Sequence, residues 1–98
     1  MKVDWDPEKN QSNKLDHDGI GFEDAQHIFE GPVLSRLDTR EDYGEDREIA
    51  YGTIGIGTVL AVVCTERGDT IRIISARKAT RSETRDYYAY LEEAFGGN

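Results

Sequence analysis

Basic residues gather late in this 98-residue chain, in and around the stretch ERGDTIRIISARKATR at 66–81. Between positions 67 and 85 six basic residues face only two acidic ones, whereas the whole chain has a formal net charge of -8. The six are Arg67, Arg72, Arg77, Lys78, Arg81 and Arg85. A positive island on an acidic protein marks a place where an anion can dock. A phosphate-bearing ligand is therefore one reading, and surface charges that pair with the acidic half are the other.

The strand pattern TIRIISAR at 70–77 determines where these cations point. Strict alternation gives one face to Ile71, Ile73 and Ser75, and the other to Arg72, Ile74 and Ala76. Continued, it places Arg77 on the Ile71 side and Lys78 on the Arg72 side, unless a bulge re-aims one of them. Two cations at the exit of a strand, just before a helix N-terminus, form a candidate phosphate site.

Two other segments offer groups for proton transfer or anion binding. His17 lies at the end of a polar helical segment, flanked by Asp16 and Asp18. The sequence GEDRE at 44–48 offers Glu45 and Arg47. The alternatives are a histidine that only stabilises a helix C-terminus and a charged hairpin loop that is only solvated.

Composition narrows the function classes. No group of His, Cys, Asp and Glu has metal-ligand spacing, so neither a metal nor a cofactor is expected. The acidic balance argues against a general nucleic-acid coat protein. Cys64 lies in an apolar run and is expected to be a buried, inert thiol. The start MKVDWDPEK lacks the apolar core of a signal peptide, and no run is long enough to span a membrane, so a cytoplasmic protein is expected.

The elements that must position these residues can be read from the pattern. Strands are predicted over 2–6, 33–38, 48–54, 58–65 and 70–76. A helix starts at Pro7 and runs to about Asp16, and another starts at Phe22 and ends at Gly31-Pro32. The last helix follows the capping box from Thr80 to Glu83 and ends at Gly96-Gly97. The order β-α-α-β-β-β-β-α predicts one α+β domain over 1–98, a largely antiparallel sheet with helices packed on one face.

Taken together, several segments resemble the BrnT family, the ribonuclease toxins of type II toxin–antitoxin systems. They are WDPEK at 5–9, Asn13 and His17, Gly19-Ile20, FEDA at 22–25, Ile28-Phe29, GEDRE at 44–48, and above all TERGDTIRIISARKATRSETRDY at 65–87. They follow the family's order over nearly the whole chain. The block from ERGD to ARKAT is the specific part.

The resemblance implies a RelE-like fold, an antiparallel sheet flanked by helices. It also implies an RNA substrate, arrest of translation, and a cognate BrnA-like ribbon-helix-helix antitoxin that forms a heterotetramer with the toxin and alone contacts operator DNA. The charged positions that it picks out here are His17, Glu45, Arg47, Arg67, Arg72, Arg77 and Lys78. One departure stands out. The family reads Lys-His-Gly before the second helix, and this chain reads Asp16-His17-Asp18-Gly19, with one extra residue.

Metal-free RNA cleavage through the 2′-hydroxyl needs a base, cations on the charged phosphorane, and an acid for the leaving oxygen. The hypothesis is that Arg77 and Lys78, helped by Arg72, clamp the phosphate. His17 or Glu45 then transfers the proton. RNA-guiding roles are assigned to Arg67, Arg47 and Arg81. The alternative is a non-catalytic module that binds nucleic acid or protein and acts as a co-repressor with its partner.

Overall fold

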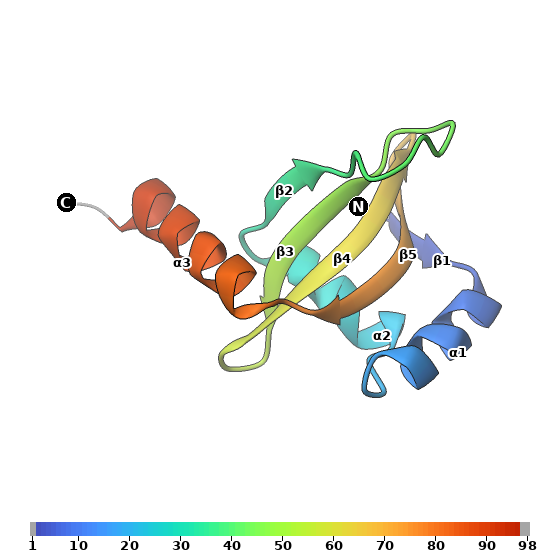
Figure 1. Cartoon of the computed structure of the whole chain (residues 1–98), viewed down its shortest axis with the longest axis horizontal. Helices are drawn as coiled ribbons and strands as arrows, with labels where there is room; N and C mark the ends of the chain where they lie inside the picture. Colours follow the sequence, from blue (N-terminus) through green and yellow to red (C-terminus); the bar gives the residue numbers. More distant parts are fainter. Residues whose placement is uncertain (1, 97–98) are drawn as a thin grey trace.

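The computed structural model describes residues 2–96 (Figure 1). Its strands are β1 (Lys2–Trp5), β2 (Leu34–Leu37), β3 (Glu48–Ile54), β4 (Thr58–Arg67) and β5 (Thr70–Lys78). Its helices are α1 (Pro7–Asp16), α2 (Phe22–Ala25), the 3₁₀ helix η1 (Gln26–Glu30) and α3 (Arg81–Phe95). The α+β class and the element order are confirmed. The second predicted helix differs in one respect, because it tightens to 3₁₀ geometry after Ala25.

The strands form one five-stranded sheet in the order β1-β5-β4-β3-β2. All neighbours are antiparallel except β1 and β5, which run parallel with Lys2 opposite Thr70 and Trp5 opposite Ile73. Because β1 stops at Trp5, the part of β5 beyond Ile73 has no strand along that edge. The basic exit of β5 therefore lies at an open corner of the sheet.

A β-bulge in β5 changes which way its last residues point. Val63 pairs with Ser75 and Cys64 pairs with Ile73, so Ile74 has no partner in β4. The extra residue reverses the alternation beyond it. Ala76 is therefore buried on the same side as Ile71 and Ile73, and Arg77 shares the opposite face with Arg72. The strict alternation predicted for Ser75, Ala76, Arg77 and Lys78 was wrong for this reason.

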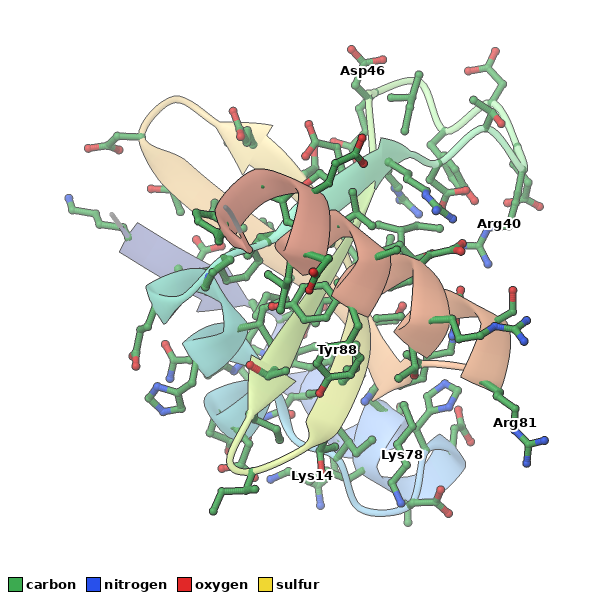
Figure 2. All side chains as sticks on the ribbon, turned by 90° about the vertical axis from the view of Figure 1, so that its left-hand side faces the viewer. Lys14, Arg40, Asp46, Lys78, Arg81 and Tyr88 are labelled. Carbon is green, nitrogen blue, oxygen red and sulfur yellow. The ribbon has the colours of Figure 1, made fainter. Side chains whose placement is uncertain are left out.

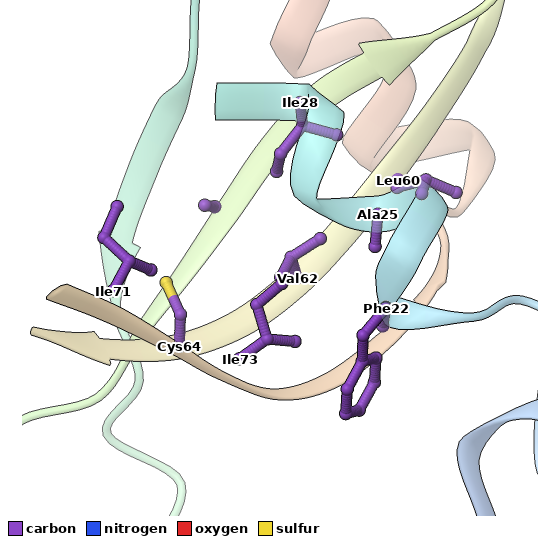
Figure 3. Packing of buried hydrophobic residues seen from close by; sticks show 10 residues of the cluster. Phe22, Ala25, Ile28, Leu60, Val62, Cys64, Ile71 and Ile73 are labelled. Carbon is purple, nitrogen blue, oxygen red and sulfur yellow. The ribbon is translucent and has the colours of Figure 1, made fainter. Parts of the chain in front are cut away.

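The main core lies between the sheet and the segment α2–η1. Phe22, Ala25 and Ile28 pack on side chains of β4 and β5, including Leu60, Val62 and Ile73 (Figure 3). Gly52 lets η1 approach β3, since a Cβ there would lie 2.8 Å from Cβ of Ile28. We call this side of the sheet the core face.

Helix α1 is attached to the core face by two asparagines rather than by apolar residues. The side chain of Asn13 donates to the carbonyl of Ala76 (2.8 Å) and accepts from its N–H (3.0 Å). Asn10 accepts from the N–H of Phe22 at 2.8 Å. The Asn13 amide thus takes the place of a strand at the open edge of β5. Leu15, the single apolar residue of α1, is 84% exposed.

Helix α3 lies on the opposite face of the sheet, so the prediction that the helices share one face was wrong for α3. The reason is a second apolar cluster, in which Tyr87 packs with Tyr51, Val59 and Ala61. The capping box of Thr80 and Glu83 is confirmed, and Gly96 caps the other end. Gly97 lies outside the described residues. Figure 1 shows α3 running outward past the end of β3.

Candidate active site

Three arginines of β4 and β5 project from the face of the sheet opposite the core face, which also carries Arg36 of β2. Thr65 pairs with Arg72 and Ala61 pairs with Arg77, and Arg67 follows Thr65 at a spacing of two residues. We call this surface the arginine face. Arg67 lies at its β4–β5 hairpin end, and Arg72 and Arg77 lie along β5. From Arg72 to Arg77 the strand covers about 15 Å.

Arg77 is held in place by the first turn of α3. Its Nη1 and Nη2 donate to the two carboxylate oxygens of Glu83 at 2.7 and 3.0 Å, and the hydroxyl of Tyr51 donates to Glu83 at 3.0 Å. These hydrogen bonds, that of Arg77 above all, lower the pKa of Glu83 to about 2. Arg77 Nε makes no hydrogen bond to any described residue and leaves one edge of the guanidinium for an anion.

A second cluster occupies the hairpin end of the arginine face. Glu45 accepts from Arg47 Nε at 3.4 Å and from Arg67 Nη2 at 3.3 Å. The guanidinium of Arg47 lies over the ring of Tyr43, 4.0 Å from its centre. Arg72 is paired separately, with Asp4 of β1 at 3.2 Å. Glu45 and Arg77 thus lie at opposite ends of β5.

The remaining predicted residues lie around the exit of β5. Lys78 belongs to the core-face side of the strand, so the phosphate clamp predicted for Arg77 and Lys78 spans both sides of the sheet. Arg81 is the exposed first residue of α3. Figure 2 shows Lys78 and Arg81 projecting from one end of the molecule.

His17 is the C-cap of α1, one turn beyond Asn13. Asn13 is bonded to Ala76, two residues before the end of β5. The extra residue of the Asp16-His17-Asp18-Gly19 segment is absorbed by a left-handed turn, with φ of 54° at Asp18 and 77° at Gly19. His17 thus follows by one turn a residue that is bonded to the last part of β5, whereas Glu45 contacts Arg67 at the other end of the strand.

Sequence reasoning missed the buried carboxylate of Asp38. Its side chain is 0% exposed and accepts from Nε and Nη2 of Arg40 at 2.8 and 2.7 Å. It also accepts from the N–H of Arg40 at 3.2 Å, an Asx turn, and the hydrogen bonds of Arg40 hold the pKa of Asp38 well below its usual range. An aspartate at the end of a strand, two residues before an arginine, was the available signal.

Glu83 and Tyr51 were also missed as partners of Arg77. The capping box explained Glu83 fully at the level of sequence, so nothing pointed to a second role. Cys64 is buried as predicted, and burial raises the pKa of its thiol to about 12. Within residues 2–96, no three His, Cys, Asp or Glu side chains come together as metal ligands, and no helix is long and apolar enough to cross a membrane.

Comparison with known proteins assigns this α+β fold to the toxins of type II toxin–antitoxin systems. A family model described as "Ribonuclease toxin, BrnT, of type II toxin-antitoxin system" matches residues 5–83. The chain belongs to this BrnT family, and all of the predicted site residues lie within the matched segment.

A solved structure of a BrnT toxin has a fold similar to that of this chain. The crystal structure of the Brucella abortus ribonuclease toxin BrnT is similar to this chain with a TM-score of 0.61 and 27% identity. The match covers 83% of this chain and 99% of the Brucella chain. No curated protein matches the chain. The family predicted from the sequence is confirmed, and most of α3 extends beyond the family match.

Proposed function

We propose that this protein is a metal-independent endoribonuclease that cleaves RNA through the 2′-hydroxyl and thereby arrests translation. The observation that carries the proposal is the bulge at Ile74, which brings Arg77 to the face that already carries Arg67 and Arg72. A row of cations with free guanidinium edges suits a phosphate backbone. The family membership makes RNA the substrate class that fits this face.

In the proposed mechanism the scissile phosphate binds at the exit of β5. Arg77 offers its free Nε edge from the arginine face, and Lys78 approaches from the other side of the strand. Together they stabilise the charge that builds up on the phosphorane. Arg81 holds the flanking phosphate on one side. Arg72 holds the next phosphate along the strand.

His17 fits the proton-transfer role better than Glu45 does. His17 lies one turn beyond Asn13, which is bonded to Ala76 near the strand exit, whereas Glu45 is bonded to Arg47 and Arg67 at the far end of β5. We assign His17 to the transfer of the 2′-hydroxyl proton. Glu45 then orients Arg47 and Arg67, which guide the RNA. A positioned proton-transfer group contributes about 10²–10⁴ in rate.

The cognate antitoxin is proposed to be a BrnA-like ribbon-helix-helix protein that forms a heterotetramer with this toxin in the cytoplasm. Operator DNA is bound through the antitoxin. Co-expression with the antitoxin gene should restore the growth of cells that expression of the toxin alone arrests.

The test is a cleavage assay with purified protein and single-stranded RNA in EDTA. We expect fragments with 2′,3′-cyclic phosphate ends, and none from an RNA that carries 2′-O-methyl groups throughout. His17→Ala should cut at least 100-fold more slowly, while Glu93→Gln on the outer side of α3 serves as the control. Intact RNA together with a gel shift would instead support the non-catalytic co-repressor.

A further inference from the structure

The loop between β2 and β3 borders an open cavity, and of the residues that line it only Arg47 has a role described above. It has a volume of about 530 Å³ and is lined by Arg40, Glu41, Tyr43 and Arg47. Binding sites for small ligands have volumes of about 300–1,000 Å³. The lining is unusual for a surface loop, because it combines two guanidinium groups, one phenol ring and one carboxylate. In a nucleotide, these groups can contact the phosphate, the base and an exocyclic amino group, respectively.

The loop is held rigidly by Asp38, although it has no regular secondary structure. The buried Asp38 carboxylate fixes Arg40 with two hydrogen bonds and also accepts from the hydroxyl of Tyr43 at 3.2 Å. The N–H of Asp38 donates to the carbonyl of Arg47 at 2.7 Å, which closes the base of the loop. A buried carboxylate is stable only with such partners. The positions of the Arg40 and Tyr43 side chains are therefore set before any ligand arrives.

The planar groups of the cavity are stacked. The guanidinium of Arg47 lies 4.0 Å from the centre of the Tyr43 ring and is fixed from the side by Glu45. Unpaired bases of single-stranded RNA stack on aromatic rings and on guanidinium planes. Arg40 remains exposed over 62% of its side chain even while Asp38 holds it. Its Nη1 edge can meet a phosphate.

The cavity adjoins the hairpin end of the arginine face, because Arg47 and Arg67 both donate to Glu45. The positive charge of Arg40 is near enough to Arg77 to lower its pKa, against the larger rise caused by hydrogen bonds to Glu83. In Figure 2, Arg40 projects toward the same side of the molecule as Arg81 at the start of α3. An RNA strand whose scissile phosphate lies at Arg77 thus passes the loop.

We infer that this cavity is a subsite for one unpaired nucleotide of the RNA that flanks the scissile phosphate. The inference rests on the proposed ribonuclease function and adds a determinant of substrate choice. Arg40 binds the phosphate of this nucleotide, and the Tyr43–Arg47 stack binds its base. The Glu41 carboxylate accepts a hydrogen bond from an exocyclic amino group, so uracil, which lacks one, should bind least well.

The test measures binding of fluorescein-labelled 2′-O-methyl octanucleotides of A, C and U sequence, which cannot be cleaved, by fluorescence anisotropy. Arg40→Gln and Tyr43→Leu should each weaken binding about tenfold, the loss expected of one stacked base or one positioned phosphate contact. Tyr43→Phe, which keeps the ring, should bind more tightly than Tyr43→Leu. Arg85→Gln on α3 removes the same charge as Arg40→Gln and should change binding less than twofold.

Asp38→Asn separates a built subsite from simple attraction of charge. The substitution removes a negative charge, so general electrostatics predicts tighter binding of RNA, whereas release of Arg40 predicts weaker binding. Thermal melting verifies that each variant is folded. Since Arg40 and Tyr43 are not core residues, their variants decide the question if Asp38→Asn does not fold.

The outcomes separate the two proposals. If the wild-type protein neither binds the octanucleotides nor cuts RNA, the proposed function fails. If the wild-type protein binds and cuts while Arg40→Gln, Tyr43→Leu and Arg85→Gln bind alike, the subsite is wrong and the ribonuclease stands. A loss with Arg40→Gln and Tyr43→Leu, together with weakest binding of the U octanucleotide, supports the subsite.

Discussion

The two faces of the sheet hold their polar side chains by different kinds of interaction. On the core face, neutral amides bond to backbone, as Asn13 does with Ala76. On the arginine face, each strand arginine has a carboxylate partner. These pairs are Arg36–Asp86, Arg67–Glu45, Arg72–Asp4 and Arg77–Glu83. The difference shows how a chain of net charge -8 uses its carboxylates to orient a row of arginine side chains. A carboxylate fixes one edge of a guanidinium and leaves another edge for an anion.

The bulge at Ile74 keeps the arginines of β5 off the core face. Without it, Arg77 would point toward α1 and Ala76 would point toward α3. With it, β5 contributes small apolar side chains to the core and all of its arginines to the other face. Bulges commonly re-aim a side chain next to a functional site. The two faces therefore differ in function, and not only in structure, if Arg77 acts on RNA and does more than tie α3 to the sheet.

Replacing Arg77 by Lys is expected to give the largest effect. Lysine keeps the charge and a contact to Glu83 but loses the fork that can bind a carboxylate and a phosphate at once. Loss of one such donor costs on the order of 10²–10³ in rate. Cleavage of RNA in EDTA should fall by that factor while the far-UV circular dichroism stays native.

The matched control is Glu83→Gln, which releases Arg77 without removing it. Its cleavage rate should fall, but less than that of Arg77→Lys, if Arg77 binds the phosphate directly, because the guanidinium remains although it is no longer held by a carboxylate. If Arg77→Lys cuts RNA as fast as wild type, Arg77 is structural and the arginine face loses its catalytic member.

The sequence was informative where local patterns decide the structure. The strands at 48–54 and 70–76, the capping box at Thr80 and the burial of Cys64 all follow from local spacing and composition. So does the family, because the block from ERGD to ARKAT has a distinctive order. The position of the bulge depends on pairing between β4 and β5, which no local pattern encodes. The role of Asp38 had a local signal, but its burial depends on how the whole loop folds.

The membership of the site stays a prediction, whereas its arrangement can be compared with the structure. The sequence placed Arg72 and Arg77 on β5, but it assigned them to opposite faces because period-two alternation ignores an unpaired residue. It offered His17 or Glu45 for proton transfer and could not tell where either lies relative to Arg77. Glu83 was hidden because the capping box already accounted for it.

The core face can be tested through Asn13. Asn13→Ala removes both hydrogen bonds to Ala76 and leaves a buried N–H and a buried carbonyl without partners. We expect a loss of about 3 kcal/mol in the free energy of unfolding, measured with urea. Gln11→Ala, an exposed neighbour on α1, should change it by less than about 0.5 kcal/mol. Equal stability of both variants would mean that α1 is held by something other than its asparagines.

The arginine face can be tested through the pH dependence of stability. The pKa of Glu83 falls to about 2 in the folded protein from an ordinary value of 4.5, so its charged form stabilises the fold. This stabilisation is fully present above pH about 5 and is lost as the pH falls from there toward 2. Glu83→Gln should cost about 2 kcal/mol at pH 7, since Gln preserves the capping box but not the ion pair.

The wild-type protein and Glu83→Gln are then compared by urea unfolding at pH 7, 4 and 3. The difference in their free energies of unfolding should shrink steadily with acidification, because protonation of Glu83 makes the wild type resemble the variant. A difference that stays constant down to pH 3 would show that Arg77 and Glu83 are not coupled as an ion pair.

The smallest expected effect concerns Leu15, the one apolar residue of α1. Its side chain is 84% exposed, so Leu15→Ser removes almost no burial and should change the free energy of unfolding by less than about 0.5 kcal/mol. Leu60, which is 1% exposed on the same face of the sheet, provides the contrast, since Leu60→Ala should cost about 2–5 kcal/mol. A loss above about 1 kcal/mol for Leu15→Ser would mean that α1 also docks through its leucine. The contrast between amide-held and ion-paired faces would then no longer describe how this helix is attached.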